Sequence, residues 1–281
     1  MVLGVLFLGV FVLTLSKLGA AFSFVPSGGS TGIPALGPVG VVLAASFSYL
    51  MSWSPYASDY SRYLPADVSG KRVALLALAG GAAASFAIEI IGALVGSLTP
   101  GAGFFTGLYQ FAGSFGPLAI VAIILGAMAA NALNIYTNAL SALVLDIRAR
   151  RWLMVVVGGL VGLALSFALQ ANFVFNYQDF LLLLDYWITP WLGIVLVDYF
   201  LAKRTTVDSS ANPPMWDRRA LAVYAVAVLV SVPFMVPLNP ISGQPLGSPF
   251  GALASIFSGA DFSYFISFGV AVVLSYVLRR R

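Results

Sequence analysis

A short polar stretch interrupts one of the long apolar segments of the chain. The segment begins at Val39 and reaches the sequence SWSPY at residues 52–56. Pro55 lacks the N–H that would bond to the Met51 carbonyl, and its ring disfavours helical backbone angles at Ser54. Within a membrane, an interrupted helix persists only where protein or a water-filled cavity satisfies its backbone groups, and such helices form the midplane sites of secondary transporters. The stretch therefore predicts a transport site.

Trp53 lies inside this interruption. Tryptophans in membrane proteins usually mark the interface with water, but Trp53 is about fifteen residues into its segment, which fits that position poorly. A flat indole beside an interrupted backbone can stack on a flat ring, a contact worth about 0.5–1.5 kcal/mol beyond burial. The half-helix that begins at Pro55 would also direct its positive end toward the midplane. Trp53 is therefore predicted to bind a planar substrate.

Three asparagines follow one face of a later segment. Asn131, Asn134 and Asn138 are spaced so that they share one side of a helix over residues 117–145. An amide offers two donors and an acceptor, which suits the amide-like edge of a planar heterocycle. The alternative is interhelical hydrogen bonding, worth about 0.6–2 kcal/mol for each asparagine. We predict that one of these three asparagines lines a substrate site, and Asn131 falls at the middle of the segment.

Two acidic residues lie within apolar segments, where a charge at the bilayer centre costs about 2.5–3.5 kcal/mol on insertion scales. Glu89 stands among phenylalanine and isoleucine residues, and Asp185 follows four consecutive leucines. Either carboxyl could carry a coupling proton, or it could be a neutral or hydrogen-bonded structural group, and the sequence leaves both interpretations open. Asp59 lies near Arg62 at the end of its segment, where an ion pair is expected.

The elements that would position these residues are membrane-spanning helices. Hydrophobic residues make up 60% of the chain and charged residues 9%, and the mean hydropathy is +0.97. A soluble domain of this size could not hide so much apolar surface. Apolar runs of spanning length predict eight helices, at residues 1–20, 38–63, 72–98, 117–145, 152–169, 178–201, 220–238 and 262–279.

The basic residues predict the orientation of these helices. With eight spans, every lysine and arginine except Lys17 falls on one face of the membrane. The positive-inside rule assigns that face to the cytoplasm, so we expect a multi-pass protein of the plasma membrane with both termini cytoplasmic. Lys17, near the outer end of the first span, can snorkel. The net charge of +4 thus reports topology, and no nucleic-acid partner is inferred from it.

Cysteine and histidine are both absent from the sequence. Their absence excludes disulfides, thiolate chemistry, zinc sites with cysteine or histidine ligands and histidine proton relays. No metal site and no catalytic group is assigned, so an enzyme is not expected. The longest hydrophilic loop covers about residues 203–219, and the chain is expected to form a single membrane domain over residues 1–281.

Four motifs, in order, resemble the nucleobase:cation symporter family, the permeases for cytosine, purines, uracil, thiamine, allantoin and hydantoins. The sequence WSPYASDYSRYLP at residues 53–65 is similar to the family's sixth-helix signature, and AANALNIY at 129–136 is similar to its eighth helix. YWITPWLG at 186–193 with DYF at 198–200 resembles the tenth helix. The tail from PFM at 233–235 to GAD at 259–261 resembles the last two helices of the cytosine/purine branch.

The resemblance implies an all-α membrane protein with the inverted-repeat fold of the leucine-transporter type, including one discontinuous helix. Residue by residue it assigns substrate stacking to Trp53 and the eighth-helix asparagine to Asn131 or Asn134. No organic cofactor is implied, only a coupling H⁺ or Na⁺. The family holds its cation partly on hydroxyl or small residues of the eighth helix, and residues 117–136 contain no serine or threonine. A proton on Glu89 or Asp185 is therefore favoured over sodium.

Family members typically have twelve helices, and the eight predicted here match the fifth through the twelfth. By this resemblance residues 1–20 are the last helix of the first repeat, 38–201 the second five-helix repeat and 220–279 two extra helices. The first four helices would then be missing, through truncation, a misplaced start or a split protein whose N-terminal half is a partner. The expected function is cation-coupled import of a nucleobase or related planar heterocycle, such as cytosine or a purine. The alternative is a non-transporting membrane remnant or a subunit of a larger assembly.

Overall fold

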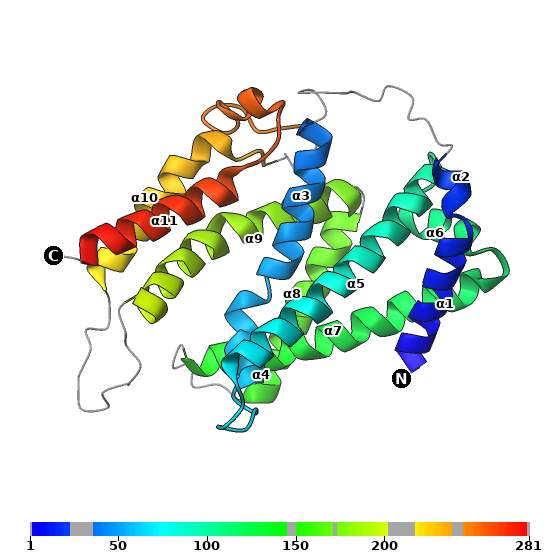
Figure 1. Ribbon diagram of the computed structural model, residues 1–281, viewed down its shortest axis with the longest axis horizontal. Coiled ribbons are helices and arrows are strands. Elements are labelled where there is room, and N and C mark those ends of the chain that lie inside the picture. Colours follow the sequence, from blue (N-terminus) through cyan, green and yellow to red (C-terminus); the bar gives the residue numbers. More distant parts are fainter. Residues whose placement is uncertain are drawn as a thin grey trace. The chain divides into compact units, whose positions relative to one another are not determined.

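The computed structural model describes residues 2–22, 36–144, 150–170, 173–201, 217–237 and 244–279, and these residues form helices, turns and loops without a β-strand of more than one residue. The chain divides into two compact units. Unit one consists of Met1–Gly29 and Asp59–Leu165, and unit two consists of Ser30–Ser58 and Ser166–Arg281. Each unit is described by itself below, with the helix labels of Figure 1.

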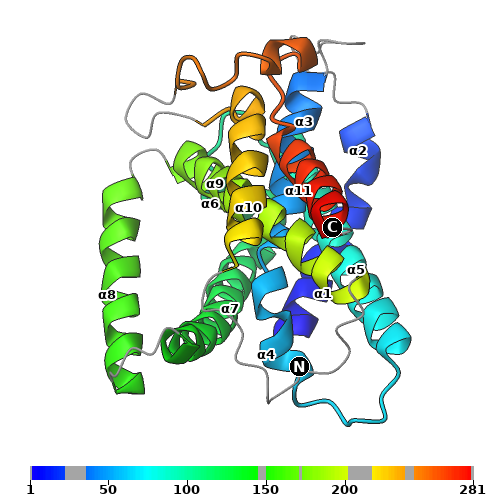
Figure 2. The same ribbon diagram turned by 90° about the vertical axis from the view of Figure 1, so that its left-hand side faces the viewer.

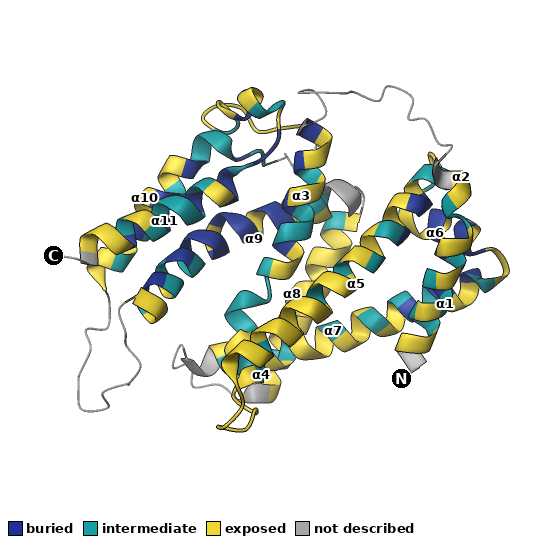
Figure 3. Cartoon of the chain, viewed as in Figure 1, coloured by how far each residue is buried: buried dark blue, intermediate teal, exposed yellow. Residues whose placement is uncertain are grey.

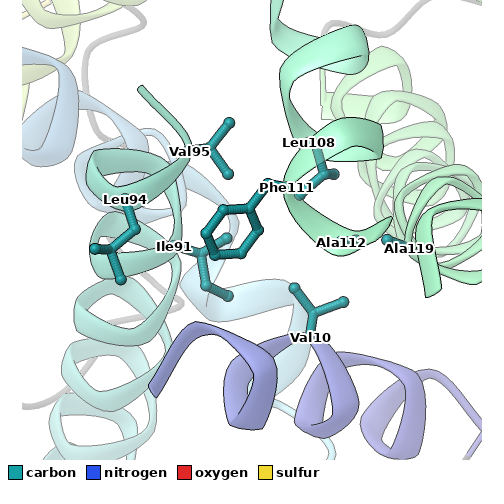
Figure 4. Close-up of a cluster of buried hydrophobic side chains, with 8 residues drawn as sticks. All are labelled: Val10, Ile91, Leu94, Val95, Leu108, Phe111, Ala112 and Ala119. Atoms are coloured by element: carbon teal, nitrogen blue, oxygen red, sulfur yellow. The ribbon is translucent and has the colours of Figure 1, made fainter. Parts of the chain in front are cut away.

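The described residues of unit one form six α-helices and the end of a seventh. They are α1 (Val2–Ser16), α2 (Leu18–Phe22), α5 (Gly70–Leu98), α6 (Phe104–Ala112), α7 (Gly116–Val144) and most of α8 (Arg151–Leu169), together with the end of α4 (Ala57–Ser61). α1 and α6 both pack against α5 and α7. Figure 4 shows the apolar core where they meet, formed by Val10, Ile91, Leu94, Val95, Leu108, Phe111, Ala112 and Ala119.

Local chemistry fixes the C-terminal end of α6 in unit one. Gly113 follows its last turn with a φ of 57°, a left-handed backbone angle that glycine adopts without steric cost. The ammonium group of Lys17 donates to the Phe111 carbonyl and lies 4.5 Å from the centroid of the Phe111 ring. Lys17 therefore satisfies a free carbonyl at the end of α6, where a positive charge is also favourable.

Unit two is built on α3 (Leu36–Met51), α9 (Phe173–Leu196), α10 (Arg218–Ser231) and α11 (Ser263–Arg279). α9 packs against each of the other three, and it lies beside α11 along much of its length (Figure 1). One buried cluster joins α3, α9, α11 and the segment after α10, and a second joins α10 and α11. The clusters are Ala44, Leu182, Tyr186, Met235 and Tyr264, and Val223, Ala227 and Ala271.

A glycine allows α9 and α11 to approach closely. A side-chain carbon added to Gly193 would lie 3.1 Å from both the Ala271 methyl and the Phe268 carbonyl oxygen, and small residues at such contacts are typical of helix packing in membranes. We expect Gly193→Leu to lower the thermal unfolding temperature of the detergent-solubilised protein by several degrees, because overpacking forces the helices apart. Gly159→Leu is the control, since nothing lies within 4 Å of Gly159. Equal effects of the two substitutions would contradict this packing.

Within the described residues, four helices are long and apolar enough to cross a membrane, over Gly70–Leu98, Phe104–Asn138, Trp152–Leu169 and Asn176–Leu201. Two shorter apolar helices cover Gly4–Ser16 and Ser263–Leu278. Half of the apolar window on α9 is buried, whereas none of that on α8 is, a contrast visible in Figure 3. α8 stands apart from the other helices of unit one along most of its length (Figure 2).

The sequence predicted most of these helices but not all of their bounds. The predicted span 38–63 is α-helical over Leu36–Met51 and Ala57–Ser61, with the predicted interruption between them, whereas α6 was not predicted at all. α6 is only nine residues long, so the apolar periodicity of its sequence is too short to distinguish a helix from a loop. The crossing of the membrane by eight spans, the repeat boundaries and the inverted-repeat arrangement stay predictions.

Candidate functional site

The predicted interruption is present at residues 52–56. α3 ends at Met51, a turn follows, and Ser54–Tyr56 form one 3-10 turn before α4 begins. Within the interruption, Trp53 keeps right-handed backbone angles (φ −81°, ψ −12°). Local hydrogen bonds persist from the Ser52 N–H to the Ser48 carbonyl at 2.8 Å and from the Tyr56 N–H to the Trp53 carbonyl at 3.0 Å. Pro55 thus changes the helix type and breaks the α-helix without leaving an extended segment.

Trp53 is half-buried in unit two and forms an aromatic corner with Tyr56. Their ring centroids are 6.3 Å apart and the planes meet at 88°, an edge-to-face contact that is favourable for aromatic pairs. No side chain of the Ser54–Tyr56 turn is fully buried. The indole is therefore held in place from one side without being part of the unit-two core.

The three asparagines lie on α7 in unit one, as predicted, and all are exposed within that unit. The Asn138 amide nitrogen lies 2.6 Å from the point where a side-chain carbon on Gly158 would be. Asn138 therefore packs against α8, which favours the interhelical interpretation for this residue. Asn131 and Asn134 belong to unit one and Trp53 to unit two, so a joint site of the three residues stays a prediction.

The two acidic candidates differ sharply in burial. Glu89 is exposed on α5 in unit one. Asp185 lies on α9 in unit two with 1% of its surface exposed, and among the described residues neither of its carboxyl oxygens has a hydrogen-bond partner. A buried carboxylate without partners is strongly disfavoured, so such a group takes up a proton instead. Asp185 is thus the better proton-binding candidate on structural grounds.

Asp185 belongs to a buried polar cluster of unit two, defined here as Ser48, Asp185, Thr189, Tyr264 and Ser267. The Ser48 hydroxyl lies beside the carboxyl but donates to the Leu181 carbonyl at 2.5 Å. The Thr189 hydroxyl donates to the backbone carbonyl of Asp185 at 2.7 Å and is 2.8 Å from the Ser267 hydroxyl.

Tyr264, from α11, adds a second unpaired polar group to this cluster. It is 0% exposed, and its hydroxyl has no hydrogen-bond partner among the described residues. The cluster therefore holds a carboxyl and a phenol that could each bind a proton or donate one, enclosed by α3, α9 and α11. The sequence pointed to Asp185 alone. Thr189 lies one turn further along α9, but Ser48, Tyr264 and Ser267 come from positions more than seventy residues away, which no local pattern brings together.

Asp261 is a polar residue that the sequence analysis did not single out. It is 3% exposed and lies just before α11. One carboxyl oxygen accepts from the Tyr186 hydroxyl at 2.7 Å and the Val236 N–H at 2.8 Å, and the other accepts from the Ser263 N–H at 2.9 Å and hydroxyl at 2.6 Å. Asp261 therefore joins α9, the segment after α10 and the start of α11. An aspartate just before an apolar helix is a capping signal, but nothing in the sequence indicated the bond to Tyr186.

Asp261→Asn should destabilise unit two, because an amide nitrogen cannot accept the bonds that the lost oxygen accepted. Hydrogen bonds to a charged group contribute about 1.5–3 kcal/mol each. Asp217→Asn is a matched control: Asp217 is exposed and accepts from the Arg219 and Ala220 N–H groups at the start of α10, and asparagine caps helices about equally well. Thermal unfolding in detergent should show a clearly lower midpoint for Asp261→Asn only. Equal midpoints for the two variants would contradict the role of Asp261.

Comparison with known protein families identifies the family of this chain. Residues 1–266 match the family model described as a permease for cytosine/purines, uracil, thiamine and allantoin. The chain belongs to this permease family. It is therefore related to membrane transporters and not to enzymes, which confirms the family resemblance drawn from the sequence motifs.

Two curated proteins are similar to this chain over most of its length. The protein named purine-cytosine permease YxlA of Bacillus subtilis is 27% identical over 256 residues, which cover 85% of this chain and 54% of the relative. Purine-cytosine permease fcyB of Emericella nidulans is 26% identical over 290 residues, which cover 96% of this chain and 56% of the relative. The chain thus spans just over half the length of these relatives. No solved structure matches it significantly.

Proposed function

We propose that the protein transports a nucleobase, cytosine or a purine, into the cell together with a proton. The observation that carries this proposal is the match of residues 1–266 to the permease family. The two relatives are named purine-cytosine permeases, which supports purines and cytosine as the proposed substrate class. Because the chain spans just over half of each relative, we expect these residues to act together with an N-terminal half that supplies the remaining helices.

The proposed substrate residues are Trp53, Asn131 and Asn134. Trp53 offers an aromatic face next to the helix interruption, and Tyr56 supports it edge-on. Asn131 and Asn134 are exposed on α7, so their amides are not used by the packing of unit one. A planar base needs a stacking surface and a polar edge contact, and these residues supply both kinds of group.

The proposed coupling ion is the proton, and its carrier is Asp185. Sodium requires several oxygen ligands, and residues 117–136 of α7 contain no serine or threonine to provide them. Asp185 is buried without a hydrogen-bond partner for its carboxyl among the described residues, whereas Glu89 is exposed in unit one. We therefore favour Asp185 over Glu89.

The proposed setting is the plasma membrane, with eight spans, both termini in the cytoplasm and the inverted-repeat fold of the leucine-transporter type. The supporting observations are the apolar helices of spanning length and the placement of the basic residues. A non-transporting remnant or an assembly subunit is the competing function.

Uptake measurements distinguish these two functions. The natural gene, with any coding sequence that adjoins it in frame, is expressed in cells that lack their own nucleobase permeases. Radiolabelled cytosine, adenine, uracil and allantoin are then offered separately. We expect saturable uptake of cytosine or adenine well above the empty-vector control. Correct membrane insertion without uptake of any of the four compounds would favour the remnant.

A further inference from the structure

Three polar side chains at the end of α4 and on α7 form a cluster that no part of the proposed function uses. The Arg62 guanidinium donates to the Tyr136 hydroxyl at 2.8 Å and to the Tyr63 hydroxyl at 3.0 Å. The two phenol oxygens are 2.5 Å apart. All three residues belong to unit one, and the bonds connect positions more than seventy residues apart in the sequence.

Arg62 does not form the ion pair with Asp59 that the sequence suggested. Among the described residues, its side chain hydrogen-bonds only to the two tyrosines. An arginine guanidinium is not deprotonated in proteins, so Arg62 stays charged and acts as a permanent donor. Phenol oxygens are weaker acceptors than carboxylates, so Arg62 binds its partners here less tightly than it would bind an acid.

Few other contacts hold α4 and the residues that follow it, the segment that this cluster attaches to α7. α4 contains no buried residue, so apolar packing does not hold it in place. It follows directly after the helix interruption, and the boundary between the two units falls between Ser58 and Asp59, within α4. The short stretch from Asp59 to Tyr63, called the arm here, is therefore where the chain passes from unit two into unit one.

We propose that Arg62, Tyr63 and Tyr136 form a releasable tie that fixes the arm to α7. All three side chains are exposed, and exposed hydrogen bonds compete with water, so the tie can break and reform at little cost. Tyr136 shares α7 with Asn131 and Asn134. The second part of the proposal rests on the proposed function. In it, the tie couples the arm, which follows the helix interruption at Trp53, to α7, the helix that carries the amide groups for the substrate.

The two bonds that reach α7 both end on Tyr136, which gives a graded expectation. Tyr136→Phe removes both links to α7, whereas Tyr63→Phe leaves the bond from Arg62 to Tyr136 in place. The double variant Arg62→Gln with Tyr136→Phe should release the arm no further than Tyr136→Phe alone, because Tyr136→Phe already removes the bond from Arg62 to α7. Tyr109→Phe is the control, since Tyr109 is an exposed tyrosine on α6, outside the tie.

The chain contains no cysteine, so two spin labels can be attached at Ser61→Cys and Leu125→Cys alone. Ser61 is exposed on the arm, and Leu125 is exposed on α7, about three turns before Tyr136 and on the same side of the helix. Pulsed electron–electron double resonance on the full-length protein in nanodiscs, without substrate, measures the distance distribution between the labels. We expect a narrow distribution for the parent and the Tyr109→Phe variant. Tyr63→Phe should broaden it slightly, and Tyr136→Phe should add a second, longer distance.

A Tyr136→Phe distribution identical to that of the parent would overturn the tie, whatever the uptake assay gives. A broadened distribution in a protein that takes up no nucleobase would support the tie and reject its part in transport. In an active protein we expect Tyr136→Phe to lower the maximal uptake rate at least threefold with less than a twofold change in KM, because the tie contacts none of the proposed substrate residues. A change confined to KM would overturn the coupling to transport.

Discussion

Replacement of Trp53 by alanine should reduce nucleobase uptake by about tenfold or more while leaving membrane insertion intact. Losing the stacking contact and its buried apolar area costs about 2 kcal/mol of binding free energy, and each 1.4 kcal/mol is about tenfold in affinity. Trp53 is only half-buried and lies outside the unit-two core, so its truncation opens no large cavity. The measurement is initial uptake at low substrate concentration, corrected for the amount of protein in the membrane.

Trp152→Ala is the matched control for this prediction. Trp152 is 59% exposed on α8 and has no proposed contact with substrate, so its loss should change uptake by less than twofold. Phenylalanine at position 53 should retain part of the activity, because it keeps a smaller stacking surface. Wild-type uptake by the Trp53→Ala variant would show that the indole does not bind substrate in this protein.

The two asparagine candidates can be separated by the same assay. Asn131 and Asn134 lie about one turn apart on α7, so a single bound base is expected to contact one amide much more closely than the other. Alanine at that position should reduce uptake severely, and alanine at the other should have a small effect. If both asparagine variants and Trp53→Ala transport like the wild type, the assignment of site residues by family resemblance is wrong for this protein.

Replacement of Asp185 by asparagine should abolish the accumulation of substrate against its gradient. Asparagine has nearly the shape of a neutral carboxylic acid, so the buried cluster of Ser48, Thr189, Tyr264 and Ser267 should keep its packing, but no proton can be carried. Wild-type uptake should rise as external pH falls and collapse with a protonophore. Asp185→Asn uptake should be insensitive to both and limited to equilibration of the substrate.

Glu89→Gln is the control for this second prediction, because Glu89 is exposed in unit one and should not affect the dependence on pH. Uptake that requires sodium, is flat in external pH and survives both substitutions would overturn proton coupling. Loss of accumulation with Glu89→Gln alone would reassign the proton to α5.

The helix interruption could be predicted from the sequence because its cause is local. Pro55 acts on its own backbone and on the residues next to it, and the structure interrupts the α-helix at that place. The same reasoning placed the long helices, whose apolar runs exceed what a soluble fold requires. The form of the interruption was not predicted: it is a 3-10 turn, which keeps local backbone hydrogen bonds without an extended segment.

The polar contacts of the folded units could not be predicted in the same way. The bond from Tyr186 to Asp261 and the tie from Arg62 to Tyr136 each join residues about seventy-five positions apart, and no local pattern indicates such pairs. Arg62 shows the consequence. Its nearest acid in the sequence is Asp59, but in the structure its guanidinium donates to the hydroxyls of Tyr63 and Tyr136. Burial separated Asp185 from Glu89, although both lie in equally apolar stretches of sequence.

The central claim is that nucleobase and proton move together, and proteoliposomes test it most directly. The purified full-length protein is reconstituted in sodium-free buffer with a pH-sensitive dye inside the vesicles, and cytosine or adenine is added outside. We predict that the substrate acidifies the lumen in the wild type and in Glu89→Gln but not in Asp185→Asn. Uptake of the radiolabelled base with no change in luminal pH, or only after sodium is added, would contradict the claim.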